Sequence, residues 1–340
     1  MLTAAVIGFG LLMVSCASTG PVPVEKVTAI SAQPVIPAPT PLAEQPLRRT
    51  PTRHIVLSVA GEDGQSMDFV LDSGASSSVI STATRDRLGL PEANSAPGFA
   101  AGAGGSLSNV TLATVPRLAV GDLELRNHTV AVMDKIMPGS VEDVDGVLGQ
   151  NFFAACEVEL DFARGRVKLY DPGTLDADKL IARGMVEVEM RRLPVGLVTL
   201  EADLVVGSAA GQPVSAILDL GAQATIINRQ AAALAGIQLP EGASQPSTKI
   251  ARGVDDRGTP CYGRRIEGLR IGDIEFGARA IQVCDLPVFN LVGLGDSPAM
   301  LLGFDVLDER TVVILGKEQL LYISAVSTSS DRAASPTQQP

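Results

Sequence analysis

The sequence predicts a mainly β protein made of two homologous lobes. From residue 53 onward, short runs of β-type residues alternate with Gly, Asp and Asn turn signals, and long amphipathic helices are scarce. The second half of the chain also repeats the first, which indicates an internal duplication. With 340 residues, of which 46% are hydrophobic, the chain is long enough to build a core in each lobe.

The N-terminal residues resemble an export signal. Residues 1–15 are apolar, too short to span a bilayer comfortably, and lead to Cys16. Residues 13–16 resemble a lipobox, after which Cys16 would carry a lipid, and Ala17 resembles the pattern of outer-membrane retention. We therefore expect export to the periplasmic side of the cell envelope, with a leader at 1–16 and a lipid anchor at Cys16. The alternatives are a plain secretory signal and an apolar leader without a function.

Two further segments lack the apolar periodicity of a core. Residues 17–50 are rich in Pro, Ala, Ser and Thr, a composition typical of a disordered tether. Residues 324–340 are similarly low in complexity and predict a disordered tail. Between them we expect a first lobe at 51–172, a connector at 173–185 and a second lobe at 186–323.

Three cysteines remain besides Cys16, so an oxidising compartment allows at most one internal disulfide. We favour the pair Cys261 and Cys284 over any pair with Cys156. The alternative is that all three are small buried hydrophobic residues.

The stretch that organises the chain is residues 69–81, which read FVLDSGASSSVIS. An apolar run predicts a buried strand that ends at Asp72, where Gly74 lets the backbone turn. The buried carboxyl group needs a partner to offset its desolvation. Residues 216–228, AILDLGAQATIIN, repeat the pattern with Asp219 in the place of Asp72. Two such acids in one chain suggest one shared site.

The other predicted elements are short. The β-type runs in the first half lie at residues 55–59, 68–71, 118–120, 129–133 and 166–170. The predicted helical pieces are residues 82–88, 150–153 and 229–235. The repeat pairs residues 118–134 with 269–285, 147–152 with 301–306, and 160–170 with 313–323. Asp219 follows Asp72 by 147 residues, and Gly303 follows Gly149 by 154 residues. Such nearly constant separations between matching residues are hard to obtain by chance.

On these motifs each half resembles one lobe of a retropepsin-like (retroviral-type) aspartic protease, especially a bacterial two-lobed aspartyl protease. The family pattern is an apolar pair, Asp-Ser/Thr-Gly-Ala, and later an apolar-apolar-Gly segment; residues 71–75 and 145–149 fit it. The resemblance implies acid-protease β-barrel lobes related by a pseudo-twofold axis. It also implies the supporting loop residues Ser73, Gly74, Ala75, Ser76, Gly221 and Ala222, and the motif glycines Gly149 and Gly303.

The resemblance further implies an aspartic endopeptidase in which Asp72 and Asp219 form the catalytic pair. Two carboxylates ~3 Å apart repel by on the order of 5 kcal/mol at an effective dielectric constant of ~20. One acid therefore keeps a proton at mildly acidic pH. The ionised acid takes a proton from water, which attacks the scissile carbonyl of a peptide or protein substrate, while the protonated acid hydrogen-bonds to the carbonyl oxygen. This chemistry requires neither a metal nor another cofactor.

The family also has glycine-rich flaps that close over substrate. In the first lobe residues 98–108 lie at this position and include Gly102, Gly104 and Gly105. In the second lobe the more charged residues 250–258 include Gly253. We expect both segments to be substrate-binding flaps, and simple linkers are the alternative.

The second lobe departs from the family pattern. Leu220 stands where the motif has Ser or Thr, and Gln223 stands where the first lobe has Ser76. Losing the hydrogen bond of that hydroxyl costs about 1 kcal/mol. A loop without it could displace Asp219 by a fraction of an ångström, which matters more for catalysis than for stability.

Three hypotheses remain open. The first is a monomer whose internal pseudo-dimer joins Asp72 and Asp219. The second is a protease that is active only as a homodimer, through Asp72 of each chain. The third is a non-catalytic lipoprotein that binds peptides or proteins with a degenerate second lobe.

The sequence lacks the motifs and charge patterns of several other kinds of functional site. The net charge of -11, without basic clusters, argues against nucleic acid and against a membrane bound through charge. Only two histidines, His54 and His128, occur, and no HExxH or close Cys pair accompanies them, which argues against a zinc site. A Gly-x-Ser-x-Gly elbow and a P-loop are also missing from the sequence.

Overall fold

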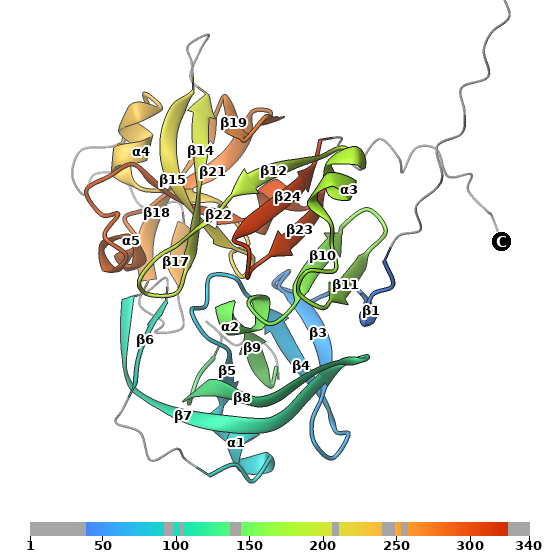
Figure 1. The fold of residues 1–340 in the computed structure, drawn as a ribbon. Coiled ribbons are helices and arrows are strands. Elements are labelled where there is room, and N and C mark those ends of the chain that lie inside the picture. The colour runs from blue at the N-terminus through green and yellow to red at the C-terminus, as the bar shows by residue number, and fades with distance from the viewer. Residues whose placement is uncertain are drawn as a thin grey trace, which may run out of the picture. The chain divides into compact units, whose positions relative to one another are not determined.

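The computed structural model describes residues 39–91, 98–102, 105–136, 144–205, 211–239, 249–252 and 258–325. The predicted leader, most of the predicted tether and almost all of the predicted tail lie outside the described residues. Figure 1 shows two groups of strands, coloured blue to green and yellow to orange, beside a sheet to which both halves of the chain contribute.

The first lobe is an eight-stranded sheet in the order β2-β3-β4-β9-β5-β8-β7-β6. Its strands are β2 (Arg48–Arg49), β3 (Ile55–Ala60), β4 (Ser66–Leu71), β5 (Val79–Ser81), β6 (Gly98–Gly102), β7 (Gly105–Val120), β8 (Leu123–Met133) and β9 (Gly146–Leu148). Because β3 pairs with both β4 and β7, six of these strands close into a barrel. The helices of this lobe are α1 (Thr82–Arg87) and α2 (Gln150–Phe153).

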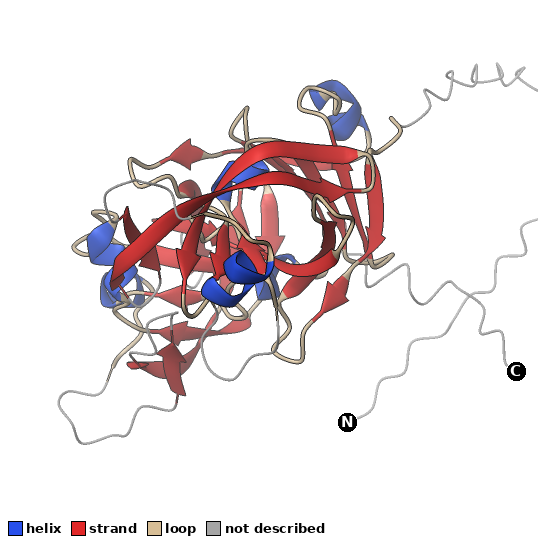
Figure 2. Ribbon diagram, turned by 90° about the horizontal axis from the view of Figure 1, so that it is seen from below, coloured by secondary structure: helices blue, strands red, loops and turns tan. Residues whose placement is uncertain are grey.

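The second lobe is a ten-stranded sheet whose main path is β17-β18-β21-β16-β22-β15-β14-β19-β20. Its strands are β13 (Arg191–Arg192), β14 (Val198–Val205), β15 (Gln212–Asp219), β16 (Ile226–Ile227), β17 (Lys249–Arg252), β18 (Gly258–Ile266), β19 (Gly268–Ile271), β20 (Ile274–Phe276), β21 (Arg279–Val283) and β22 (Ala299–Gly303). Its helices are α4 (Arg229–Leu234), α5 (Pro287–Leu291) and α6 (Phe304–Leu307). The helices within the described residues are short pieces among the strands (Figure 2).

A third sheet joins the two lobes, in the order β1-β11-β10-β23-β24-β12. Its strands are β1 (Ala43–Pro46), β10 (Glu157–Asp161), β11 (Arg166–Tyr170), β12 (Met185–Glu189), β23 (Thr311–Leu315) and β24 (Leu320–Ser324). At its centre β10 of the first half pairs antiparallel with β23 of the second. These are the closing strands that the sequence repeat had matched, and their pairing ties the lobes together.

The same arrangement of parallel and antiparallel strand pairs occurs in both lobes. β4 runs parallel to β9, and β15 runs parallel to β22. β5 pairs antiparallel with β9, and β16 pairs antiparallel with β22. This repeated topology confirms the predicted mainly β fold of two related lobes. The predicted strands and helices within the described residues are also confirmed, because each lies within or within one residue of an observed element.

Buried aliphatic and aromatic side chains explain why β4 and β15 hold their positions. Phe69, Val70 and Leu71 of β4 and Ile217 and Leu218 of β15 are fully buried. Each such side chain contributes about 1.5–3 kcal/mol through burial. The apolar runs that precede the two acids therefore fix the strands that carry them.

Two predicted segment boundaries differ from the structure. Residues 43–49 were expected in the tether but form β1 and β2, which pair with β11 and β3. Leu42 and Leu47 pack against the core at either end of β1, a pattern too short to read as periodicity. The predicted connector contains α3 (Ala177–Ala182), whose N-terminus Asp176 caps, and β12 starts within it at Met185.

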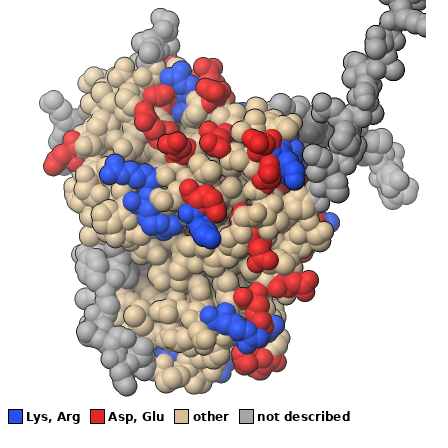
Figure 3. Space-filling model, in the orientation of Figure 1, with Lys and Arg blue, Asp and Glu red and all other residues tan. Residues whose placement is uncertain are grey.

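The charged side chains on the surface and the lengths of the helices concern the predictions made about nucleic acid and membranes. On the face shown in Figure 3, Lys and Arg side chains are interspersed with Asp and Glu side chains. Among the residues that the structure describes, no helix is both long and apolar enough to cross a membrane.

Candidate active site

The two predicted acids meet at the ends of equivalent strands. β4 ends at Leu71, so Asp72 follows it directly, and Asp219 is the last residue of β15. The two carboxyl groups hydrogen-bond to each other. Asp72 is partly exposed and Asp219 is 9% exposed, so the pair is accessible from one side but largely removed from water.

Backbone N–H groups hold each carboxyl group in its loop. Gly74 N–H donates to Asp72 Oδ1 at 2.7 Å, and Ala222 N–H donates to Asp219 Oδ1 at 2.9 Å. The backbone of Gly221 also lowers the pKa of both acids, from the opposite lobe in the case of Asp72. Such donors stabilise the ionised form of a carboxyl group.

The two loop glycines leave room for the acids of the opposite lobe. A Cβ at Gly74 would come to 2.5 Å from Asp219 Oδ1, and a Cβ at Gly221 would come to 2.6 Å from Asp72 Oδ1. Both separations are far below van der Waals contact. Each glycine is therefore required because the other loop's carboxyl group lies against it.

Ser73 links the loops that carry Asp72 and Asp219 through its hydroxyl group. Ser73 Oγ donates to Leu218 C=O at 2.9 Å and accepts from Leu220 N–H at 3.0 Å. The reciprocal side-chain bonds are absent because Leu220 has no hydroxyl group; its side chain is fully buried in the main hydrophobic core. Even so, the two carboxyl groups remain in hydrogen-bonding contact, because the backbone of Leu220 keeps its bond to Ser73.

The two motif glycines pack closely against the backbone of the loops that carry the acids. A Cβ at Gly149 would come to 2.8 Å from Ala75 O, and one at Gly303 would come to 2.9 Å from Ala222 O. Gly149 N–H donates to the hydroxyl of Ser78. Gly303 N–H donates in the same way to Thr225.

The hydroxyl groups of Ser78 and Thr225 are anchored in turn. Ser78 Oγ donates to Asn151 Oδ1 and Thr225 Oγ1 donates to Asp305 Oδ1. Ser78 and Thr225 were not singled out from the sequence, although they occupy equivalent places in the two repeats. The repeat was the available signal, since a hydroxyl is kept at this place in both.

The pKa values of both acids are raised. Burial raises the pKa of Asp72, against the opposing effect of N–H donors from Gly74, Gly221 and Ala75. Burial, followed by the charge of Asp72, raises the pKa of Asp219 well above its usual range. The pair titrates as a unit, and in the state with one proton the two carboxyl groups share it.

The predicted flap of the first lobe contains a β-hairpin. β6 and β7 pair antiparallel, and Gly102 pairs with Gly105 at its end. In the second lobe β17 pairs with β18 up to Arg252 and Gly258. Gly104 and Gly253 lie outside the described residues. Substrate contact by these segments stays a prediction.

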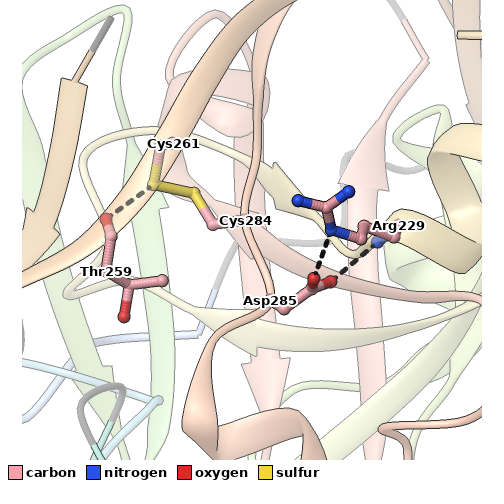
Figure 4. Close-up of a disulfide and its surroundings, with 5 residues drawn as sticks. All are labelled: Arg229, Thr259, Cys261, Cys284 and Asp285. Atoms are coloured by element: carbon pink, nitrogen blue, oxygen red, sulfur yellow. Dashed lines mark hydrogen bonds and ion pairs between the residues drawn. A yellow bond between two sulfur atoms is a disulfide. The ribbon is translucent and has the colours of Figure 1, made fainter. Parts of the chain in front are cut away.

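The second lobe contains the disulfide that the cysteine count favoured. Cys261 of β18 is bonded to Cys284, which follows β21 (Figure 4). The neighbouring residue Asp285 forms an ion pair with Arg229 at 2.7 Å. Cys156 is buried as a free thiol. The predicted pairing is confirmed.

No group of three or more His, Cys, Asp or Glu side chains that could hold a metal ion occurs among the described residues. Asp72 and Asp219 are two carboxyl groups that share a hydrogen bond. Their arrangement suits the activation of a water molecule between them.

Comparisons with solved structures agree with this fold. The chain is similar to an aspartic proteinase from Irpex lacteus, with 12% identity and a TM-score of 0.51 over 85% of this chain and 99% of that one. It is equally similar to conglutin gamma, a basic 7S globulin from lupine seeds, with 12% identity and a TM-score of 0.51 over 86% and 97% of the two chains. At this identity the likeness shows the fold alone. No curated protein matches the sequence.

A protein-family model assigns the sequence to a family, whereas the solved structures show only the fold. The model of the aspartyl protease family matches the chain twice, over residues 57–152 and 205–306. The first match contains Asp72 and Gly149, and the second contains Asp219 and Gly303. The two matches cover more than half of the chain and confirm the duplication inferred from its repeat. The chain therefore belongs to the aspartyl protease family.

Proposed function

We propose that this chain is an aspartic endopeptidase that hydrolyses peptide bonds with Asp72 and Asp219 as its catalytic pair. The observation that carries the proposal is the hydrogen bond between the two carboxyl groups, each of which lies against the loop glycine of the other lobe. Membership of the aspartyl protease family supports the same reaction class.

The single proton that the two acids hold suggests a division of roles. The ionised carboxyl group takes a proton from a water molecule whose oxygen attacks the scissile carbonyl carbon, and the protonated carboxyl group gives its proton to the carbonyl oxygen. The leaving nitrogen then takes the proton that came from water, and the C–N bond breaks. As the C=O bond reforms, its hydroxyl group returns a proton to the second acid, so the peptide bond is hydrolysed without a covalent intermediate.

The site also supports the monomeric hypothesis. Both carboxyl groups come from one chain, and Asp219 occupies the place that Asp72 of a second chain would take in a homodimer. Two lobes joined through β10 and β23 need no second copy to complete the pair.

The experiment that tests the proposal is peptide cleavage by the purified protein from residue 39 onward. A broad peptide library is incubated between pH 3 and 7 and cleavage is followed by mass spectrometry, with Asp72→Asn as the matched control. We expect cleavage with an acidic optimum in the wild type and none in the variant. A folded wild type that cleaves nothing would overturn the proposal and favour the non-catalytic hypothesis.

We also propose that the protein is exported and tethered to the membrane through Cys16. The disulfide between Cys261 and Cys284 supports an oxidising compartment. The leader residues themselves lie outside the described part of the chain. Fractionation of cells and mass spectrometry of the N-terminal peptide test this proposal, and an unmodified leader found in the cytoplasm would contradict it.

A further inference from the structure

Two equivalent turns reach across from one lobe to the catalytic loop of the other. In the first lobe, Thr50 N–H donates to His54 C=O and Arg53 N–H donates to Thr50 C=O. In the second lobe, Leu193 and Gly196 make the same two bonds with Leu197 and Leu193. Arg53 and Gly196 also share a positive φ, of 71° and 91°. Residues 50–54 and 193–197 are therefore counterparts in the duplicated fold.

The turn of the second lobe meets the first catalytic loop through apolar or small groups. A Cβ at Gly196 would lie 3.4 Å from the Cβ of Ser76. Leu197, the counterpart of His54, is buried in an apolar cluster of the second lobe. The first catalytic loop is the one that retains its hydroxyl group, at Ser73.

The turn of the first lobe meets the second catalytic loop through a histidine. His54 is 4% exposed, and its Nε2 lies 3.1 Å from the side-chain nitrogen of Gln223. Because the amide nitrogen of Gln223 can only donate, Nε2 of His54 accepts its hydrogen bond. Burial lowers the pKa of His54 and so favours the neutral ring that this bond requires.

The other side of the imidazole is held within its own turn. Nδ1 lies 2.9 Å from Thr52 Oγ1 and 3.4 Å from Thr50 Oγ1. Both ring nitrogens of His54 therefore have partners, and the ring bridges the first lobe to Gln223 of the second catalytic loop. Gln223 directly follows Ala222, whose N–H donates to Asp219 Oδ1. The imidazole thus holds the loop segment that positions Asp219.

We infer that His54 is a positioning residue that sets the second catalytic loop from the opposite lobe. It performs the function that a hydroxyl group at Leu220 would otherwise share. The asymmetry of the two turns carries this inference, because the polar bridge occurs only at the loop whose hydroxyl group is missing. The inference rests on the proposed function, since the loop it sets carries Asp219.

The test replaces each partner by its counterpart in the other lobe. His54→Leu copies Leu197, and Gln223→Ser copies Ser76. Because His54 acts on the placement of the acids and not on substrate binding, we expect His54→Leu to lower kcat about tenfold or more while KM changes less than about threefold. His54→Asn, which keeps a side-chain acceptor for Gln223, should recover most of kcat. Val195→Ala, on the equivalent turn, serves as the control and should leave both constants unchanged.

The outcomes separate the two proposals. A wild type that cleaves nothing overturns the proposed function. An active wild type with unchanged kcat in His54→Leu overturns only the role of His54, as does equal impairment of the Leu and Asn variants. If His54→Leu does not fold, Gln223→Ser decides: a selective fall in kcat supports the bridge, and an unchanged kcat overturns it.

Discussion

The carboxyl group of Asp219 lies against Gly74, the residue two places after Asp72 in the opposite catalytic loop. Gly221 and Asp72 repeat this relationship in the other direction. The two loops therefore interlock, and the position of each acid depends on the absence of a side chain in the other loop.

Gly221→Ala is expected to lower kcat about a hundredfold, because its Cβ would come to 2.6 Å from Asp72 Oδ1 and displace one of the two acids. Peptide-cleavage kinetics measure the effect. Gly277→Ala is the control, since a Cβ at Gly277 meets no atom within 4 Å. Equal activity of the two variants would show that the loops are not interlocked in solution.

Ser73→Ala is expected to destabilise the fold by about 1–3 kcal/mol, because it leaves the buried Leu220 N–H without its acceptor. Urea unfolding followed by circular dichroism measures the change. Ser66→Ala, at the exposed start of β4, should change stability little. A loss no larger in Ser73→Ala than in Ser66→Ala would contradict the proposed link between the lobes.

The pKa of Asp219 predicts how stability depends on pH. A carboxyl group whose pKa is raised in the folded state binds more protons folded than unfolded, so stability decreases as pH rises from about 4 through the raised value. Asp219→Asn removes this group and mimics its protonated form. The variant should match the wild type in stability at acidic pH and exceed it at pH 7, by about 1.4 kcal/mol for each unit by which the pKa is raised. Denaturant unfolding across this pH range measures the difference in stability between the variant and the wild type. A variant less stable than the wild type at pH 7 would contradict the prediction.

Reduction of the disulfide is expected to destabilise the protein by about 2–4 kcal/mol. Cys261 and Cys284 lie 23 residues apart and join β18 to the segment before α5. Thermal unfolding with and without dithiothreitol measures the effect, and the double variant Cys261→Ser/Cys284→Ser should no longer respond to the reductant. Burial raises the pKa of the Cys156 thiol, so this residue should not contribute. An unchanged melting temperature would contradict a structural role for the bond.

The sequence predicted the parts of the site that depend on local pattern. Apolar runs before Asp72 and Asp219 identified the strands, and the repeat paired Gly149 with Gly303. The bridge from His54 could not be predicted, because its partner Gln223 is 169 residues away and a lone histidine has no periodicity. β1 was missed for a similar reason: its four residues are stabilised by pairing with β11, which a composition rich in proline conceals.

If Asp72 and Asp219 of one chain form the catalytic pair, Asp219→Asn should fold, have the mass of a monomer, and lose at least about a thousandfold in kcat/KM. The kcat/KM of this variant is therefore the decisive measurement. Cleavage by Asp219→Asn at the wild-type rate, with loss only in Asp72→Asn, would instead indicate a site built from Asp72 of two chains.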